Sequence, residues 1–259
     1  MDPFRQSAER PSVGDLESSP NWPPGEVLVQ VATFNEQEHI ERLIDNILAQ
    51  SDRLQLLIVD DDSPDGTGRT AMAAAERHPR LHVLVRRGRR GIGSATLEGY
   101  QVAKARGFSI SVTLDGDFSH NPADIERLLT ALDPVGGKPA DMAIGSRRVA
   151  GGRTVGWPIR RHVASLLVAI FCRWILRIPV RDPSSGFRAI RLRVIDTLAT
   201  PISTGFAFLE ELLLRIQRAG ARVVEVPITF TDRSSGMSKA GYRESLRAMM
   251  DLVRIALSS

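Results

Sequence analysis

The stretch LQLLIVDDDSPDGT, residues 54–67, joins an apolar segment to an acidic turn and decides the fold class. Its first part, Leu54–Asp60, is apolar almost throughout, which is typical of a parallel strand buried on both faces. The Asp, Ser, Pro and Gly residues that follow favour a tight turn. From Thr67 the pattern becomes helical as far as His78. The stretch therefore predicts a strand that turns into a helix, the repeating unit of an α/β sheet.

The same alternation of strand and helix continues on both sides of this stretch. The helical segments have the length of crossover connections between parallel strands. Asn121 suits the N-terminal cap of the last of these helices, and Pro122 suits its first turn. We therefore expect an open, mostly parallel α/β sheet with helices on both faces. The predicted strands are Val27–Thr33, Leu54–Asp60, Leu81–Val85, Ser109–Asp115 and Asp141–Ser146, and the predicted helices are Glu36–Gln50, Thr67–His78, Gly91–Arg106 and Pro122–Leu132.

Composition limits the class of protein. The chain has 259 residues, of which 42% are hydrophobic, so it can bury the core of one large domain. A single cysteine, Cys172, excludes an internal disulfide and a cysteine-based zinc cluster. The formal net charge is +4, and the arginine runs do not alternate with aromatic residues, which make up 5% of the chain. We therefore expect no nucleic-acid partner.

The two ends of the chain differ from its middle. Residues 1–25 are polar and proline-rich, without an apolar signal segment, and we expect a flexible tail there. We expect residues 26–259 to form a single domain. The longest apolar run, His162–Ile178, is interrupted by two arginines, so it predicts a buried helix or one at a membrane interface rather than a spanning helix. From Tyr242 the sequence is typical of an amphipathic helix, which could pack on the domain or contact a membrane surface.

Carboxylates gather in the segments that follow the predicted strands. In an open α/β sheet, ligands bind beyond the carboxyl ends of the strands, so these segments would share one edge. Carboxylates placed close together repel one another unless they are protonated or share a cation. Asp115 and Asp117, on either side of Gly116, could both reach a hard cation such as Mg²⁺ or Mn²⁺, although Asp and Gly are also ordinary turn residues. The acids expected at this edge are Asp60, Asp61, Asp62, Asp65, Asp115 and Asp117.

Eight motifs follow one another along the chain: TFNEQEHI, LLIVDDDSPDGT, GIGSA, TLDGDFSHNP, GSRRVAGG, GWPIRRHVAS, DPSSGFRAIR and VVEVPITFTDRSSGMSK. Together they resemble the inverting GT-A glycosyltransferases of family 2, and within them the dolichyl or polyprenyl phosphate mannose synthases. The resemblance extends from about Val27 to Lys239. It implies a GT-A, Rossmann-like nucleotide-sugar-binding fold and the transfer of mannose from GDP-mannose to a polyprenyl phosphate. The same fold with UDP-glucose or another donor, or with another acceptor, is an alternative, and a non-catalytic nucleotide or nucleic-acid binder is a more distant one.

The resemblance implies roles for residues around the acidic edge. Asp115 and Asp117 match the catalytic pair that binds Mg²⁺ or Mn²⁺ on the donor diphosphate. Arg233 and Lys239 match a loop that closes over the diphosphate and stabilises the leaving group, which makes them catalytic as well. The sugar nucleotide would be held by Ala32, Phe34, Glu36, Val59, Asp61 and Gly116 together with Arg233 and Lys239, whereas Asp60 and Asp62 would shape the loop.

The resemblance also implies an acceptor site and a place in the cell. Arg147, Arg161 and Ser165 match positions that face the acceptor phosphate, and a planar guanidinium group suits phosphate oxygens. Glu211 matches an acidic position, which would either bind a sugar hydroxyl or sit at a helix N-terminus for the sake of the helix. The lipid phosphate is mostly dianionic at neutral pH, so it needs no general base. The enzyme would lie peripherally on the cytoplasmic face of a membrane, and a separate membrane-anchoring subunit is compatible with this arrangement.

Overall fold

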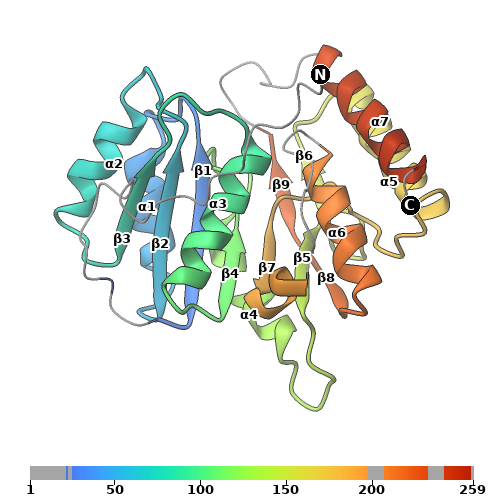
Figure 1. Ribbon diagram of the computed structural model, residues 1–259, viewed down its shortest axis with the longest axis horizontal. Coiled ribbons are helices and arrows are strands. Elements are labelled where there is room, and N and C mark those ends of the chain that lie inside the picture. The colour runs from blue at the N-terminus through green and yellow to red at the C-terminus, as the bar shows by residue number, and fades with distance from the viewer. Residues whose placement is uncertain (1–21, 23–24, 198–206, 233–241, 258–259) are drawn as a thin grey trace, which may run out of the picture.

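A seven-stranded sheet in the order β3-β2-β1-β4-β7-β5-β8 forms the centre of the protein (Figure 1). The computed structural model describes Trp22 and residues 25–197, 207–232 and 242–257. All neighbouring strands in the sheet are parallel except β7, which is antiparallel to both β4 and β5. This confirms the mostly parallel α/β sheet. The strands are β1 (Val27–Thr33), β2 (Leu54–Asp60), β3 (Leu81–Val85), β4 (Ile110–Thr113), β5 (Met142–Ser146), β7 (Arg188–Arg191) and β8 (Val223–Pro227), while β6 (Arg153–Val155) pairs with β9 (Thr229–Thr231) in a small second sheet.

The predicted helices exist, with shorter bounds than the sequence pattern indicates. The first begins at Ile40 rather than Glu36, because the Glu36 carbonyl accepts bonds from the His39 and Ile40 amides and closes a turn there. Asn121 caps the start of the last of these predicted helices as expected, since its Oδ1 accepts a 3.1 Å bond from the Ala123 amide. The helices are α1 (Ile40–Leu48), α2 (Thr67–Ala75), α3 (Ile92–Ala105), α4 (Ile125–Leu132), α5 (Ile159–Trp174), α6 (Phe208–Arg218) and α7 (Tyr242–Leu257), with 3₁₀ turns η2 (Pro122–Asp124) and η3 (Leu192–Thr197).

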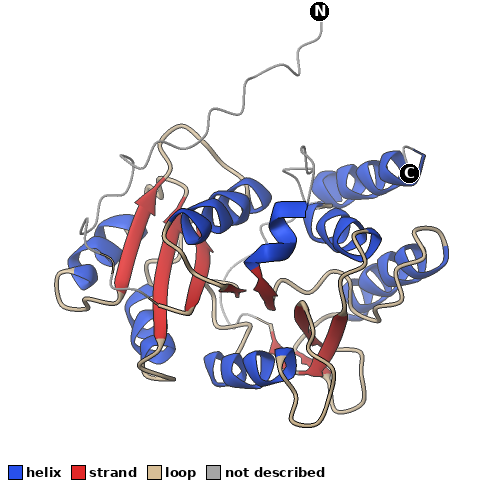
Figure 2. Ribbon diagram, turned by 60° about the horizontal axis from the view of Figure 1, so that its bottom comes forward, coloured by secondary structure: helices blue, strands red, loops and turns tan. Residues whose placement is uncertain are grey.

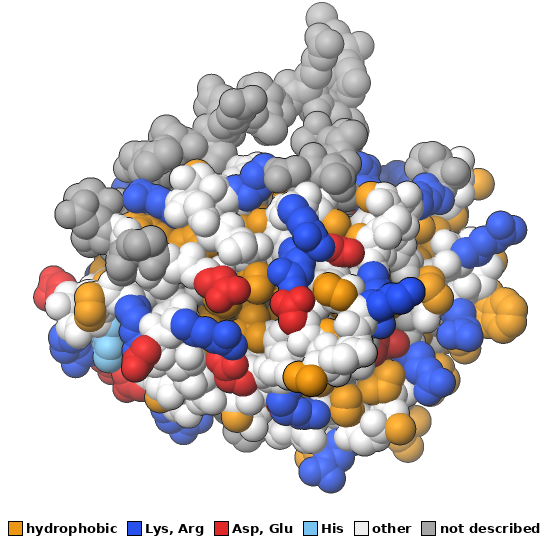
Figure 3. Space-filling model, turned by 90° about the horizontal axis from the view of Figure 1, so that it is seen from below, with side chains coloured by type: hydrophobic (Ala, Val, Ile, Leu, Met, Phe, Trp, Pro, Cys, Tyr) orange, Lys and Arg blue, Asp and Glu red, His pale blue; other side chains and the backbone are white. Residues whose placement is uncertain are grey.

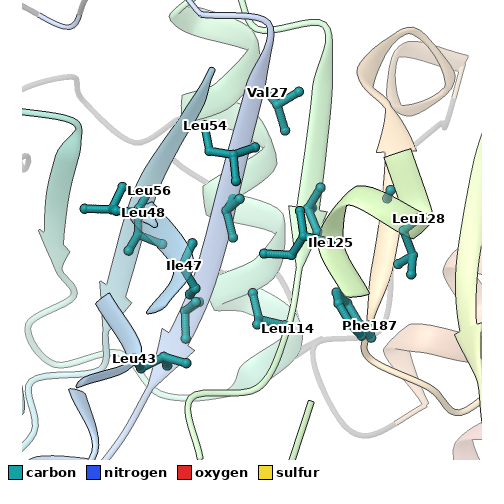
Figure 4. Close-up of a cluster of buried hydrophobic side chains, with 14 of the residues drawn as sticks. Val27, Leu43, Ile47, Leu48, Leu54, Leu56, Leu114, Ile125, Leu128 and Phe187 are labelled. Carbon is teal, nitrogen blue, oxygen red and sulfur yellow. The ribbon is translucent and has the colours of Figure 1, made fainter. Parts of the chain in front are cut away.

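Two hydrophobic cores cover the two faces of the sheet. Alternate residues of each strand point to opposite faces, so Val27, Val29 and Val31 of β1 join one core and Leu28 joins the other. Helices α1, α2 and α4 pack on the first face, and α3, α5, α6 and α7 supply the second (Figure 2). Figure 4 shows part of the first core, where Ile125 and Leu128 of α4 approach the strands. The strands are apolar throughout because both of their faces are buried.

Trp22, in the segment predicted to be a tail, packs on the sheet. Its indole stacks on the His82 ring at a centroid distance of 3.6 Å, and the Arg106 guanidinium lies 4.9 Å from the indole. Burial, with the charge of Arg106, lowers the pKa of His82 to about 4. His82 is therefore neutral near pH 7, and its Nε2 donates to Gln55 Oε1 at 2.7 Å. Trp22 thus shields a buried polar pair.

Helices α5, α6 and α7 lie together on one side of the molecule (Figure 1). The apolar run that begins at His162 forms most of α5, but only Cys172 of this helix is fully buried, so the expectation of a buried helix is wrong. In α7, Leu252 packs into the core, whereas Met250, Val253 and Leu257 of the predicted apolar side are exposed. Within the described residues, no helix has the length and hydrophobicity to cross a membrane.

The face of the molecule seen from below carries side chains of both charges. On the face shown in Figure 3, basic and acidic side chains are interspersed with apolar ones. Several surface arginines pair with carboxylates, including Arg53 with Glu126 and Arg77 with Glu41.

Candidate active site

The loops after β1, β2 and β4 meet at the carboxyl edge of the sheet. Thr33 at the end of β1 donates its hydroxyl to the Asp60 carboxylate at the end of β2, with a distance of 2.7 Å. A Cβ atom on Gly116, in the loop after β4, would lie 3.3 Å from Thr33 Cγ2 and 3.5 Å from Glu36 Cγ. Gly116 therefore lets the third loop approach the first closely. The predicted acidic edge is present.

These loops also concentrate backbone strain. Within the described residues, four non-glycine residues have a positive φ angle, and three of them are Asn35, Asp62 and Phe118, with φ values of 57°, 52° and 60°. One lies in each of the three loops. Left-handed conformations of this kind are costly for residues with a Cβ and cluster at functional sites.

Asp60 and Asp65, two of the clustered acids, form hydrogen bonds within and between the loops. Asp60 accepts bonds from the amide and hydroxyl of Ser63 at 2.8 and 2.6 Å, so it shapes the loop as predicted. Asp65 accepts bonds from the Thr67 amide at 2.9 Å and the Gln37 amide at 3.1 Å, and so ties the first two loops together. The expected repulsion between these carboxylates is thus relieved by hydrogen bonds.

Asp61 is held at the start of α3. Its Oδ2 accepts a 2.7 Å bond from the Gly91 amide, and its Oδ1 lies 2.9 Å from Arg86 Nη1. Arg86 is itself buried and also contacts Glu98 at 3.1 Å. Burial raises the pKa of Asp61 above its usual 3.8, while the Gly91 amide and Arg86 act in the opposite direction. A nucleotide base at this position would meet a carboxylate that is already ordered.

Asp115 and Asp117 differ from the other acids in their surroundings. The Asp115 side chain is 34% exposed and lines a cavity. Asp117 is largely buried, and its Oδ1 accepts a 2.9 Å bond from the Ser119 amide. His120, which sequence reasoning did not assign a role, accepts a 3.2 Å bond at Nδ1 from the Asp115 amide. Burial lowers the pKa of His120, so it is a neutral ring that orients Asp115 rather than a cation that neutralises it.

A divalent cation would fit this pair with help from a ligand. Two carboxylates separated by one residue offer hard oxygen donors of the type that Mg²⁺ and Mn²⁺ prefer. Within the described part of the chain, no group of three or more His, Cys, Asp or Glu side chains could hold a metal. A cation at Asp115 and Asp117 would therefore complete its coordination with water and the oxygens of a bound diphosphate, as Mg²⁺ commonly does.

The loop before β7 joins the same edge because β7 runs in the opposite direction. Its amino end lies beside the carboxyl ends of β4 and β5. The Thr113 hydroxyl donates to the Gly186 carbonyl at 2.7 Å, which fastens this loop beside β4. Asp182 in the loop is fully buried, and its amide donates to Glu225 at 3.0 Å. The antiparallel strand thus adds a fourth loop to the site.

Arg147 is fixed by Asp182. Its Nε and Nη2 donate to the two carboxylate oxygens at 2.8 and 2.6 Å, and its backbone amide adds a third bond of 2.8 Å. Burial raises the pKa of Asp182, but the hydrogen bonds and charge of Arg147 outweigh burial and bring that pKa below 3.8. None of these bonds uses Nη1, so that edge of the planar guanidinium could still meet a phosphate oxygen.

One cavity of about 390 Å³ is lined by some of the predicted donor residues together with the predicted acceptor residues. Trp157 forms part of its wall and lies between two arginines, with the Arg161 guanidinium 4.3 Å and the Arg147 guanidinium 5.0 Å from the indole. These cation–π contacts and the 2.6 Å ion pair of Arg161 with Asp232 hold the two positive charges in place. Of the predicted site residues, Ala32, Asp115, Arg147, Arg161 and Ser165 line the cavity.

The other predicted residues lie outside this lining. Phe34 is half-exposed, with the Arg90 guanidinium 4.6 Å from its ring. Val59 is a core residue, so only its backbone could face a ligand. Glu36 is mostly buried, and its amide donates to Thr67 Oγ1 at 2.9 Å. Arg233 and Lys239 fall outside the described residues.

Two neighbouring acids at the start of α6 have different partners. Glu211, the residue implied by the resemblance, lies 2.6 Å from Arg215 one turn along the helix. Glu210, which sequence reasoning missed, lines the cavity. Nothing in the sequence separates them, because both are glutamates in the first turn of the same helix.

Comparison with known proteins agrees with this arrangement. The family model for Glycosyl transferase family 2 matches residues 29–225, which extend from within β1 to within β8. The chain belongs to glycosyl transferase family 2. This confirms the family predicted from the motifs.

Among curated members of glycosyl transferase family 2, three relatives are similar over most of this chain. A polyprenol monophosphomannose synthase of Mycolicibacterium smegmatis is 40% identical over 84% of this chain and 82% of its own length. An undecaprenyl-phosphate mannosyltransferase of Micrococcus luteus is 37% identical over 90% of this chain and 95% of its own length. A dolichol-phosphate mannosyltransferase of Pyrococcus furiosus is 36% identical over 82% of this chain and 58% of its own length.

Solved structures support the GT-A fold. Glucosyl-3-phosphoglycerate synthase from Mycobacterium tuberculosis, in complex with Mn²⁺, UDP-glucose and phosphoglyceric acid, superposes with a TM-score of 0.65. The identity is 20%, and the match covers 93% of this chain and 86% of that one. At this identity the likeness concerns the fold alone.

Proposed function

We propose that this protein transfers mannose from GDP-mannose to a polyprenyl phosphate and inverts the anomeric configuration. The observation that carries the proposal is one cavity whose lining includes both a carboxylate suited to a metal–diphosphate, Asp115, and the residues Arg147, Arg161 and Ser165. The three curated relatives, named as mannose transferases to polyprenyl phosphates, favour the same acceptor and sugar.

The donor would lie across the carboxyl edge of the sheet, where dinucleotide and nucleotide ligands of open α/β sheets bind. Asp61, Phe34 and the β1 loop would face the nucleoside, and the Asp115–Asp117 pair would hold Mg²⁺ or Mn²⁺ on the diphosphate. When bound, the cation supplies positive charge that stabilises the leaving nucleoside diphosphate. The ordered contacts of Asp61 and Asp117 described above mean that these carboxylates need little rearrangement to receive the donor.

The reaction would be an in-line displacement. An oxygen of the acceptor phosphate forms a bond to the anomeric carbon of mannose, while the bond from that carbon to the diphosphate oxygen breaks and its electron pair leaves with the diphosphate. A phosphate monoester has its second pKa near 6, so at neutral pH the nucleophile is already largely dianionic. The work of the protein is positioning: Asp182 and Trp157 hold Arg147 and Arg161 for the acceptor phosphate.

The lipid would leave the cavity along α5. Ala164, Ser165 and Val168 of this helix line the cavity. On its outward side, Ile159, Val163, Leu167 and Trp174 are 81%, 50%, 55% and 73% exposed. Arginines at positions 160, 173 and 177 are also exposed. An exposed apolar helix face with arginines at its margins suits the interface of a membrane with anionic lipids. We propose that α5 docks on the cytoplasmic face of such a membrane.

A donor screen tests the proposed reaction. The protein is incubated with GDP-mannose, UDP-glucose or UDP-mannose, with Mn²⁺, and with a polyprenyl phosphate in detergent. We expect a mannosyl phospholipid from GDP-mannose, and none after the metal is removed by a chelator. A glucosyl lipid would show that the donor is UDP-glucose rather than GDP-mannose. The absence of a lipid product with every donor would refute the proposed reaction.

Membrane docking makes a separate prediction about exposed residues of α5. The double substitution Leu167→Glu, Trp174→Glu should reduce sedimentation with vesicles of phosphatidylglycerol and phosphatidylcholine by about tenfold or more, because it removes apolar burial and adds negative charge. The folded state should be little affected, since both side chains point to solvent.

The control for this experiment is Val135→Glu, a substitution at a fully exposed residue in the loop after α4. It should leave vesicle binding unchanged. Transfer to a polyprenyl phosphate dispersed in detergent should also remain near the level of the unsubstituted protein in both variants. Equal vesicle binding by the two variants would show that α5 does not contact the membrane.

A further inference from the structure

Glu210 is a buried acid in the wall of the active-site cavity, and its carboxyl group is only partly satisfied. The residue is 4% exposed and lines the same cavity as Asp115 and Arg147. In the described part of the protein, its Oε2 atom has no hydrogen-bond partner. Buried side-chain oxygens are rarely left without a partner in native proteins, and each exception calls for an explanation.

Holding a carboxyl group in this place opposes folding. Burial raises the pKa of Glu210 to about 7, although the positive charges of Arg188 and Arg147 act in the opposite direction. Arg188 does not relieve the acid by hydrogen bonds, because its guanidinium donates to the carbonyls of Ser185, Leu209 and Pro183. An apolar side chain of the same length would avoid the desolvation of a carboxyl group altogether.

The next residue shows that the helix itself does not require this acid. Glu211 occupies the same first turn of α6 and forms a charged pair with Arg215, at 2.6 Å. An acid that serves only the N-terminus of α6 is therefore already present. Glu210 is thus not needed as the N-terminal acid of α6, and its Oε2 atom remains without a hydrogen-bond partner among the described residues.

The chemistry of the site limits what could satisfy Glu210. A phosphate group would be repelled by a carboxylate, and a polyprenyl chain has no hydrogen-bonding group. A metal ion is a poor match, since a hard divalent cation takes about six or more oxygen ligands and Glu210 offers one carboxyl group. A sugar hydroxyl can both donate to a carboxylate and accept from a carboxylic acid, so it fits the acid in either protonation state.

We propose that Glu210 recognises the transferred hexose, with its unpartnered Oε2 hydrogen-bonded to one hydroxyl of the sugar in the bound donor. This inference rests on the proposed function, because it takes the cavity to hold a sugar nucleotide. It makes Glu210 a specificity-determining residue. A buried group that hydrogen-bonds a substrate hydroxyl rejects analogues that lack the hydroxyl far more strongly than an apolar pocket does.

The test compares sugar nucleotides with bare nucleotides. Calorimetry in the presence of Mn²⁺ gives the affinities for GDP-mannose and GDP, and for UDP-glucose and UDP. For each pair, the ratio of the two affinities reports contacts made by the sugar. We expect Glu210→Met to lower this ratio about tenfold for the preferred donor and to change the affinity for the bare nucleotide less than twofold. Glu210→Gln, which keeps a hydrogen-bonding group, should restore most of the ratio.

Thermal unfolding separates recognition from a structural role. Glu210→Met should unfold at the same temperature as the natural protein or at a higher one, because it removes a buried carboxyl oxygen, Oε2, that has no hydrogen-bond partner among the described residues. A side chain with only a structural role would give the opposite result, a lower melting temperature with an unchanged ratio. That result would overturn the proposal.

Deoxy analogues identify the contact. The natural protein should bind one deoxymannose form of GDP-mannose more weakly than GDP-mannose itself. Glu210→Met should bind these two donors with the same affinity, because the hydroxyl missing from the analogue has lost its carboxyl partner in this variant. If Glu211→Gln lowers the ratio and Glu210→Met does not, sugar recognition belongs to Glu211 and the proposal fails. The proposed lipid transfer can fail independently: a protein that makes no lipid product still gives binding ratios that decide the role of Glu210.

Discussion

Asp117→Asn should lower kcat/KM for sugar transfer about a thousandfold while the protein remains folded. Asparagine can still accept the 2.9 Å bond from the Ser119 amide, so the loop after β4 should keep its shape. The variant loses the negative charge that the proposed metal–diphosphate requires. The measurement is steady-state transfer at saturating Mn²⁺, together with Mn²⁺ binding in the presence of GDP, which should weaken in parallel.

A neighbouring acid supplies the matched control. Asp62 lies in the loop after β2, is exposed, and has a φ of 52°, a left-handed conformation that asparagine adopts readily. Asp62→Asn removes the same charge from the same edge of the sheet and should retain activity within about twofold of the natural protein. A thousandfold loss in both variants would indicate that activity depends on the total negative charge at this edge of the sheet rather than on a metal bound by Asp115 and Asp117. Full activity of Asp117→Asn would contradict the proposed role of Asp117.

Arg147→Met should destabilise the fold by about 3 to 5 kcal/mol, the usual consequence of leaving a buried charge without its partner. Asp182 is fully buried and takes three of its hydrogen bonds from Arg147. Transfer should fall as well, since the variant removes a guanidinium from the acceptor end of the cavity. Chemical denaturation at pH 7 measures the stability change, and the double variant Arg147→Met, Asp182→Asn should recover part of it.

The same pair predicts how stability depends on pH. Arg147 holds the pKa of Asp182 below 3.8 in the folded protein, so the contribution of the pair is present above that value and is lost as the pH falls through the folded pKa. The free energy of unfolding should therefore decline more steeply below about pH 4 in the natural protein than in the double variant. Identical acid profiles would show that the pair does not stabilise the fold.

The parallel half of the sheet could be predicted because its strands are buried on both faces. Continuous apolar runs such as Leu54–Asp60 leave a clear signal, and the rule that ligands bind after parallel strands led directly to Asp115 and Asp117. β7 left no such signal. Its segment, Arg188–Arg191, has arginines at both ends, and the buried Arg188 is stabilised by carbonyls from separate segments that only the folded chain brings together.

The sequence also left the loop with Asp182 unpredicted as part of the site. The rule for parallel strands indicates the loops that follow each strand, but β7 is antiparallel, so the loop that joins the site comes before it and contains Asp182. The ion pair of Asp182 with Arg147 spans 35 positions of sequence. Likewise, the difference between Glu210 and Glu211 depends on which side of α6 meets the cavity. Local pattern places a residue on a helix or a loop, but contacts between distant segments decide its chemistry.

Helix α5 presents two surfaces whose positions are tied by helical geometry. Arg161, Ser165 and Val168 face the cavity, whereas Val163, Leu167 and Trp174 face outward. Each residue turns an α-helix by about 100°, so deleting one residue from the middle of α5 would rotate every later side chain by that angle. The proposed acceptor site and the proposed membrane contact would then be disturbed by one event. Evolution can alter either surface by substitution, but it cannot lengthen or shorten this segment without redirecting both.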